Sequence, residues 1–144
     1  WNEFKHKARV IKDFGDLPEI SCFPQQLNQV FLNILLNAAQ AIEDKGVVAI
    51  STSNLYLDEP MKGYEDMAIG EYVLLNISDN GVGISQEHIQ RIFEPFYTTK
   101  PLGEGSGLGL SVVHGIIKSH KGEISIADNI PKGTIFKIKL PLNF

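Results

Sequence analysis

The chain has 144 residues and a mass of 16.0 kDa, enough for about one domain with a substantial core. Its 13 basic and 17 acidic residues give a formal net charge of −4, which argues against a nucleic-acid partner, because phosphate backbones bind clustered cations. The single cysteine, Cys22, excludes an internal disulfide and fits a reducing compartment. We expect Cys22 to pack as a small buried hydrophobic residue.

Neither a secretion signal nor a membrane span is expected. The first residues are charged and lack an apolar core. The longest uncharged run, residues 20–42, contains seven Asn or Gln residues and is too polar to cross a bilayer. We therefore expect a soluble, cytoplasmic chain without direct membrane contact.

Short strands and helices account for most of the chain. In chain order we expect strands at 8–14 and 20–23, a helix at 24–44, a strand at 47–55, a hairpin loop at 56–71, a strand at 72–79, a short helix at 86–92, a longer helix at 107–120, and strands at 122–127 and 134–140. Pro24 suits the first turn of its helix, and Gly46 stops it. Frequent hairpin-like links favour a mixed or largely antiparallel sheet covered by helices on one face.

The helix that begins at Pro24 has an apolar stripe and a purely amide stripe. The apolar stripe consists of Leu27, Phe31, Ile34, Leu35, Ala38 and Ile42. The amide stripe consists of Gln26, Gln29, Asn33, Asn37 and Gln40. A solvated face normally carries charge, so uncharged amides suggest a recessed polar surface that meets a ligand, although an ordinary Asn/Gln-rich surface is the alternative. Amide oxygens suit magnesium.

Two glycine clusters, at residues 76–84 and 103–110, bracket about twenty residues. The first follows an apolar strand, and the second leads directly into a helix whose N-terminus can bind phosphate. Either cluster alone could be only a turn. Neither has the spacing of a P-loop or of a dinucleotide fold. Together they favour a nucleotide site with a mobile cover.

Four motifs, in order, resemble those of the ATP-binding catalytic domain of sensor histidine kinases, within the superfamily of gyrase, heat-shock chaperone, kinase and mismatch-repair ATPases. Four segments of this chain resemble the family's boxes: QVFLNILLNAAQA at 29–41 resembles the N box, and DNGVGI at 79–84 resembles the first glycine box. IFEPFYTTK at 92–100 resembles the F box, and GEGSGLGL at 103–110 resembles the second glycine box. Thr134 matches the small third box on the last strand.

The resemblance implies an α/β two-layer sandwich of the Bergerat type. A mixed sheet of about five strands would pack on one face against about three helices. Residues 1–144 would be a single ATP-binding catalytic domain with an ATP lid at about 85–106, and the dimerisation, phosphoacceptor and sensor segments would be absent. This domain would bind ATP and Mg2+.

The resemblance also assigns roles to individual residues. It implies that Asn37 is the magnesium ligand, that Asn33 lies near the phosphates, and that Lys100 reaches the γ-phosphate, which makes Asn33 and Lys100 the candidate catalytic residues. Asp79 would read adenine, because a carboxylate accepts a hydrogen bond from the 6-amino group and none from the guanine carbonyl. The candidate ATP-binding residues are Asn37, Asp79, Gly81, Gly83, Ile84, Thr99, Lys100, Gly105, Gly107, Leu108, Gly109, Leu110 and Thr134.

Position 33 distinguishes phosphoryl transfer from hydrolysis. Hydrolysing members of the superfamily carry a glutamate there as general base, whereas the amide of Asn33 takes no proton at neutral pH.

None of the four histidines, His6, His88, His114 and His120, has the setting of a phosphoacceptor, and a structural role is expected for the last two. The implied partners are the phosphoacceptor and dimerisation helices of the same kinase and the receiver domain of a response regulator. The fragment would be monomeric and the full-length protein a homodimer.

Three residues depart from the pattern of the relatives. Gln40 replaces a lysine, Ala41 replaces an aromatic residue, and Phe23 replaces the aspartate that caps the helix. Phe93 and Phe96 are either core residues or a hydrophobic latch for the lid or the phosphoacceptor helix. A serine kinase that sequesters a transcription factor and a degenerate nucleotide-binding interaction domain are the alternative functions.

Overall fold

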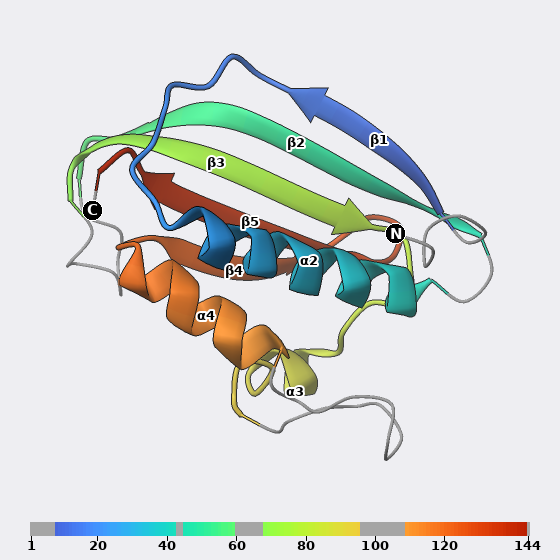
Figure 1. The fold of residues 1–144 in the computed structure, drawn as a ribbon. Helices are drawn as coiled ribbons and strands as arrows, with labels where there is room; N and C mark the ends of the chain where they lie inside the picture. Colours follow the sequence, from blue (N-terminus) through green and yellow to red (C-terminus); the bar gives the residue numbers. More distant parts are fainter. Residues whose placement is uncertain (1–7, 43–44, 60–67, 96–108, 144) are drawn as a thin grey trace.

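The computed structural model describes residues 8–42, 45–59, 68–95 and 109–143. Within them, the strands β1 (Ala8–Phe14), β2 (Gly46–Leu57), β3 (Gly70–Asp79), β4 (Glu123–Asp128) and β5 (Thr134–Pro141) form one mixed sheet. The strand order is β1-β2-β3-β5-β4, with β1 parallel to β2 and every other neighbouring pair antiparallel. The helices α2 (Pro24–Ala41) and α4 (Gly109–Ser119) lie side by side on one face of the sheet, and α3 (Gln86–Ile89) is a single turn near the start of α4 (Figure 1). The predicted α/β sandwich is confirmed.

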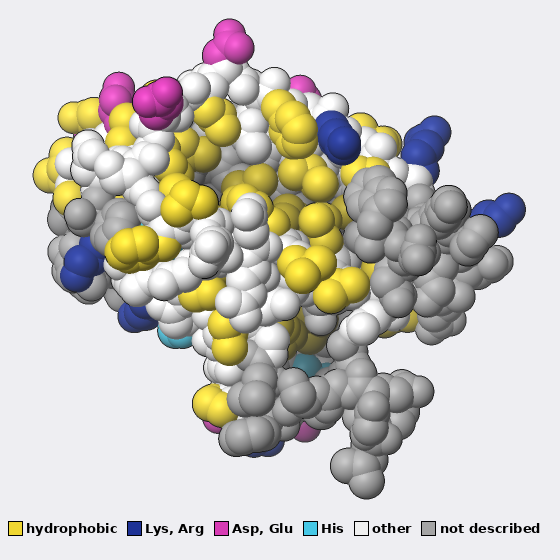
Figure 2. Space-filling view, viewed as in Figure 1, with side chains coloured by type: hydrophobic (Ala, Val, Ile, Leu, Met, Phe, Trp, Pro, Cys, Tyr) yellow, Lys and Arg dark blue, Asp and Glu magenta, His cyan; other side chains and the backbone are white. Residues whose placement is uncertain are grey.

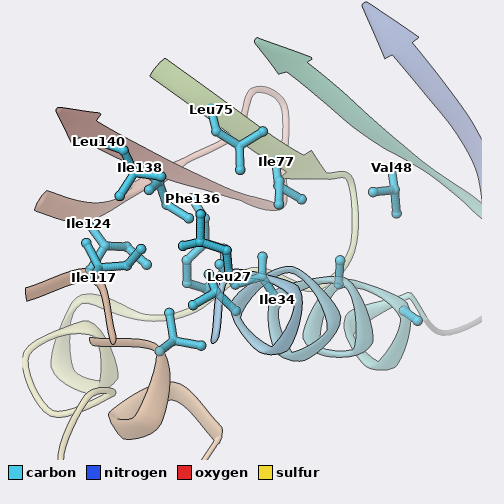
Figure 3. Packing of buried hydrophobic residues seen from close by; sticks show 14 of the residues in the cluster. Leu27, Ile34, Val48, Leu75, Ile77, Ile117, Ile124, Phe136, Ile138 and Leu140 are labelled. Carbon is cyan, nitrogen blue, oxygen red and sulfur yellow. The ribbon is translucent and has the colours of Figure 1, made fainter. Parts of the chain in front are cut away.

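The core lies between the sheet and the two longer helices. Alternate residues of β3 and β5 face the helices, as the period of a strand requires. Figure 3 shows Ile77 and Phe136 of the sheet pointing toward Ile34 on α2, with Ile117 of α4 beside Ile124. In the stripe predicted for α2, Leu27, Ile34 and Ala38 are buried and Phe31 and Leu35 pack against them, so it is a core stripe in the structure.

The register of the sheet brings three chain segments together at one end. Asp79, the last residue of β3, pairs with Val48 near the start of β2 and with Thr134 at the start of β5. The turn that follows β3 and the turn that precedes β5 therefore meet at this end of the sheet. This end of the sheet also lies next to the C-terminal end of α2, as the backbone contacts described below show.

The strand predicted at residues 20–23 is wrong. Ser21 makes one backbone hydrogen bond, from its N–H to the carbonyl of Leu142 at 2.7 Å. The N–H of Phe23 donates instead to the side chain of His120 at 3.0 Å. A strand needs a ladder of backbone pairs, and this segment has a side-chain acceptor where the ladder would continue.

Helix ends differ from the predictions by a few residues. α2 ends at Ala41 rather than at residue 44, because Ile42 adopts an extended conformation and turns its side chain into the core. α3 ends at Ile89 rather than at residue 92, and turns follow it. For the helix predicted at 107–120, the described part begins at Gly109 and ends at Ser119. The loop predicted at 56–71 is shorter, since β2 extends to Leu57.

The helices cover the sheet unevenly. On the face seen in Figure 2, hydrophobic side chains stay visible between α2 and the β1 edge of the sheet, where Phe14 of β1 is 59% exposed. Among the described residues, no helix has both the length and the hydropathy that crossing a bilayer would require.

Candidate functional site

A buried carboxylate lies at the end of β3. Only 2% of Asp79 is exposed, and its Oδ1 accepts a hydrogen bond from the N–H of Gly81 at 2.9 Å. The backbone of Thr134 also stabilises the charged form by a hydrogen bond. Burial nevertheless raises the pKa of Asp79 above its ordinary value, because desolvation outweighs both backbone contacts. The group is a carboxylate with unused acceptor capacity in a largely dry place.

The turn after Asp79 packs directly on the last turn of α2. The N–H of Val82 donates to the carbonyl oxygen of Ala41 at 3.0 Å. A Cβ on Gly81 would overlap the same carbonyl group, so the close approach requires glycine. This contact joins the first glycine box to the helix that carries the N box.

The start of β5 closes the other side of the carboxylate. Thr134 is buried and pairs with Asp79 in the ladder. Gly133 has a φ of +112°, and a Cβ there would overlap the carbonyl oxygen of Asp79. Gly83 has a φ of +79° and faces Gly133, and Ile84 after it is partly buried. The candidate residues of the first glycine box and of β5 thus lie together.

The amide stripe of α2 is only partly recessed. Asn33 and Asn37 are partly buried, whereas Gln26, Gln29 and Gln40 are exposed, so the prediction of a continuous recess is wrong for the three glutamines. Among the described residues, none forms a hydrogen bond with the side-chain amide of Asn37.

Asn33 connects α2 to the beginning of α4. Its Nδ2 donates to the carbonyl oxygen of Gly109 at 3.2 Å, and its side chain lies within 4.0 Å of the place that a Cβ on Gly109 would occupy. Leu110 is partly buried and packs against the core. The other candidate phosphate-binding residues, Thr99, Lys100, Gly105, Gly107 and Leu108, lie outside the described residues.

The first described part of the predicted lid rests on α4. Phe93 packs against the core, and its ring stacks on His114 with centroids 5.0 Å apart and an angle of 26° between the planes. Burial and the nearby charge of Lys118 lower the pKa of His114, which favours the neutral ring in this stack. Phe93 therefore has the packing of a core residue, and Phe96 lies outside the described residues.

The N-terminus of α2 has no side-chain cap and is held instead by a hydrogen bond between Phe23 and His120. Phe23 is the N-cap residue of α2 and provides no side-chain cap. His120 is 2% exposed, accepts from the N–H of Phe23 through Nε2, and donates from Nδ1 to the carbonyl of Ile116 at 2.8 Å. The expected structural role of His120 thus has a concrete form, since its ring joins the start of α2 to the end of α4.

Two asparagines near the carboxylate were missed by the sequence analysis. Asn80 accepts through Oδ1 from the N–H of Val47 at 2.8 Å and fixes the glycine turn to β2. Its position inside an Asp-Asn-Gly turn is a usable sequence signal. Asn129 donates to the carbonyl of Asp79 at 2.8 Å, and no local pattern predicts a partner 50 residues away.

A magnesium ion would depend on its nucleotide for most of its ligands. In the described parts of the chain, no group of three or more His, Cys, Asp or Glu side chains has the geometry of a metal site. The amide of Asn37 suits a single contact with a hard cation that keeps waters and phosphate oxygens as its other ligands. The donor set fits magnesium bound together with phosphates.

Comparisons with known proteins find relatives that match most of the chain. The family model described as "Histidine kinase-, DNA gyrase B-, and HSP90-like ATPase" matches residues 23–143. The sensor kinase CckA of Brucella abortus (strain 2308) is 42% identical over 117 residues, which cover 81% of this chain and 12% of that protein. The sensor histidine kinase ZraS of Escherichia coli (strain K12) is 40% identical over 127 residues, which cover 88% of this chain and 24% of that protein.

A solved structure supports the same assignment of the fold. The mycobacterial sensor histidine kinase MprB superposes with a TM-score of 0.72 and 27% sequence identity, covering 93% of this chain and 81% of that one. The chain spans less than a quarter of the length of the two curated relatives above.

Proposed function

Because the chain belongs to the histidine kinase-, DNA gyrase B- and HSP90-like ATPase family, we propose that it binds Mg-ATP and donates the γ-phosphate to a histidine on a separate dimerisation segment of a two-component sensor histidine kinase. The observation that carries the proposal is the buried carboxylate of Asp79 beside a glycine turn. Burial disfavours the charge of this group, so the capacity to accept a further hydrogen bond beyond those from Gly81 and Thr134 favours recognition of a ligand donor.

Base recognition is assigned to Asp79. The carboxylate keeps acceptor capacity beyond its bond to Gly81 and takes a hydrogen bond from the 6-amino group of adenine. Gly81 and Gly83 let the turn after Asp79 pack closely on α2 and on Gly133, which fixes the backbone around the carboxylate where the base would bind.

The triphosphate is assigned to the helix side of the site. Magnesium supplies charge neutralisation on the phosphate oxygens when bound, and Asn37 is the side chain that would hold it. Gly109 and Leu110 lie at the beginning of α4, where backbone N–H groups favour anions. Phosphate contacts by Thr99, Lys100, Gly105, Gly107 and Leu108 are proposed from the resemblance alone.

Transfer is favoured over hydrolysis by the chemistry of Asn33. Its Nδ2 is bound to the carbonyl of Gly109, and an amide does not accept a proton from water at neutral pH. Phosphoryl transfer requires positioning and charge neutralisation more than a strong base. The γ-phosphoryl group would leave the bridging oxygen of ATP, with ADP as the product, and bond to a ring nitrogen of the acceptor histidine.

Two of the described histidines, His114 and His120, are poorly placed to be that acceptor. His120 uses both ring nitrogens in hydrogen bonds, and His114 is stacked on Phe93. We therefore propose that the chain is a catalytic domain with a lid at about residues 85–106, and that its partners are the dimerisation helices of the same kinase and a response regulator. A monomeric fragment, a homodimeric full-length protein and a cytoplasmic location complete the proposal.

The test is phosphotransfer to a separately produced dimerisation hairpin of the same kinase. With γ-labelled ATP and magnesium, the hairpin should acquire label that is lost in acid and kept in alkali, as a phosphohistidine requires. A hairpin whose acceptor histidine is replaced by glutamine is the control and should stay unlabelled. Acid-stable label on serine, or release of free phosphate without labelled protein, would refute the proposal.

A further inference from the structure

The main chain of Asp79 is held by a side chain from another turn. Asn129, between β4 and β5, donates from Nδ2 to the carbonyl oxygen of Asp79 at 2.8 Å. Asp79 is the residue assigned to base recognition, and Asn129 lies outside every motif identified in the sequence. The bond connects segments 50 residues apart.

The amide of Asn129 has only one workable orientation. The side-chain Oδ1 accepts from the backbone N–H of Ile130 at 2.9 Å, and the backbone N–H of Asn129 donates to the carbonyl of Gly133 at 3.0 Å. Exchanging the oxygen and nitrogen of the amide would place two donors together at Ile130 and two acceptors together at Asp79. The donor to Asp79 is therefore fixed by the turn itself.

We infer that Asn129 is a positioning residue for base recognition, which sets the direction of the Asp79 carboxylate without touching the nucleotide. The carbonyl that Asn129 holds is bonded to the Cα that carries the carboxylate, so loss of this bond would let the main chain at Asp79 shift and move the carboxylate with it. The N–H of the same peptide, that of Asn80, donates to the carbonyl of Val47 at 3.3 Å, and Gly133 packs against its carbonyl, so the bond from Asn129 is one of three contacts that fix this peptide. This inference rests on the proposed function, since it assigns Asn129 to the same site.

The chain contains a matched control for this bond. Asn54 of β2 also donates from Nδ2 to a main-chain carbonyl in a distant segment, that of Asp16, at 2.9 Å. Asn54 lies six ladder positions along β2 from Val48, the partner of Asp79, or roughly 20 Å at the rise of a strand. Replacing Asn54 removes the same chemical group far from the site.

The experiment compares Asn129→Ala with Asn54→Ala. Dissociation constants for Mg-ATP and Mg-GTP are measured by calorimetry or by competition, together with thermal unfolding. Asn129→Ala should weaken ATP binding by about 3- to 10-fold, the effect of one lost hydrogen bond, and should leave GTP binding nearly unchanged, because the carboxylate makes no favourable bond to the 6-carbonyl of guanine. The preference for ATP should fall by the same factor, and Asn54→Ala should keep the wild-type preference.

A second measurement needs no nucleotide. Loss of the restraint should speed hydrogen exchange at the N–H of Gly81, which the Asp79 carboxylate accepts, relative to the N–H of Val47, which Asn80 holds. Should Asn129→Ala not fold, Asn129→Ser is tested in the same way.

The outcomes separate this inference from the proposed function. A wild-type chain that binds no Mg-ATP would overturn both. A wild-type chain that prefers ATP, with an Asn129 variant that keeps the preference and the slow exchange at Gly81, would overturn the positioning role alone. Equal losses for ATP and GTP alongside a lower unfolding temperature would mean that Asn129 only stabilises the turn.

Discussion

Replacing Asp79 by asparagine tests base recognition with a change of one atom. The variant keeps the size of the side chain and an oxygen that can accept from Gly81, whose N–H lies 2.9 Å from Oδ1 in the wild type. It removes the charge and leaves a single oxygen for the two backbone donors, Gly81 and Thr134. An amide oxygen occupied in this way has little capacity for a third donor.

The expected loss follows from the kind of bond removed. A hydrogen bond to a charged acceptor contributes about 1.5–3 kcal/mol, so Asp79→Asn should weaken Mg-ATP binding about 10- to 150-fold. GTP should lose nothing, since its 6-carbonyl cannot donate, and the new amide can donate to that carbonyl. The preference for ATP over GTP should therefore shrink by at least the loss in ATP affinity.

Calorimetry with both nucleotides measures these losses, with thermal unfolding as a check on the fold. Asp58→Asn is the matched control, because Asp58 is exposed just beyond β2, at the opposite end of the β2–β3 hairpin from Asp79. A folded Asp79→Asn variant with the dissociation constant of the wild type would refute the adenine role. A loss shared by Asp58→Asn would point to net charge instead of the specific carboxylate.

The remaining predictions concern the metal, the γ-phosphate, pH and the backbone. Asn37→Ala should abolish the magnesium-dependent part of ATP binding and keep the fold; equal affinity of the wild type with and without a chelator would contradict the metal role. Lys100→Ala should slow phosphotransfer to the hairpin more than it weakens ATP binding, as single-turnover rates set beside dissociation constants would show. Because the pKa of Asp79 is raised by burial, acidification should protonate it at a higher pH than an ordinary aspartate, so ATP binding should weaken earlier in a pH titration, and Asp79→Asn should lack that dependence. Gly133→Ala should lower the free energy of unfolding by about 2–5 kcal/mol, whereas Gly115→Ala, on open helix surface, should raise it by about 0.5–1 kcal/mol; denaturant titrations would check both, and an unchanged Gly133 variant would count against the close contact at Asp79.

The elements that carry the site were predictable from local patterns. The strand that ends at Asp79 is a short apolar run closed by an Asp-Asn-Gly turn, and the helix start at Pro24 has a conformational cause that needs no tertiary information. The apolar stripe of α2 follows the period of a helix, and Ile34 is fully buried as that period predicts.

Features that depend on distant segments were not predictable. Residues 20–23 resemble a strand locally, yet the N–H of Phe23 is taken by His120, which is 97 residues further along the chain. The end of α2 depends on Ile42 entering the core, and the carbonyl of Asp79 is held by Asn129, 50 residues away. In each case a contact between distant segments outweighs a local preference, and one sequence does not reveal such a contact.

The contact between the first glycine turn and α2 has a consequence for the dimensions of the ligand. The peptide groups of Ala41 and Val82 are bonded directly, so the helix that carries Asn37 and the strand that ends at Asp79 form one rigid frame. If Asp79 reads the base and Asn37 holds the metal, this frame measures the length of the nucleoside between them. An analogue stretched by one methylene group between sugar and phosphate would then satisfy one end of the frame or the other, but not both.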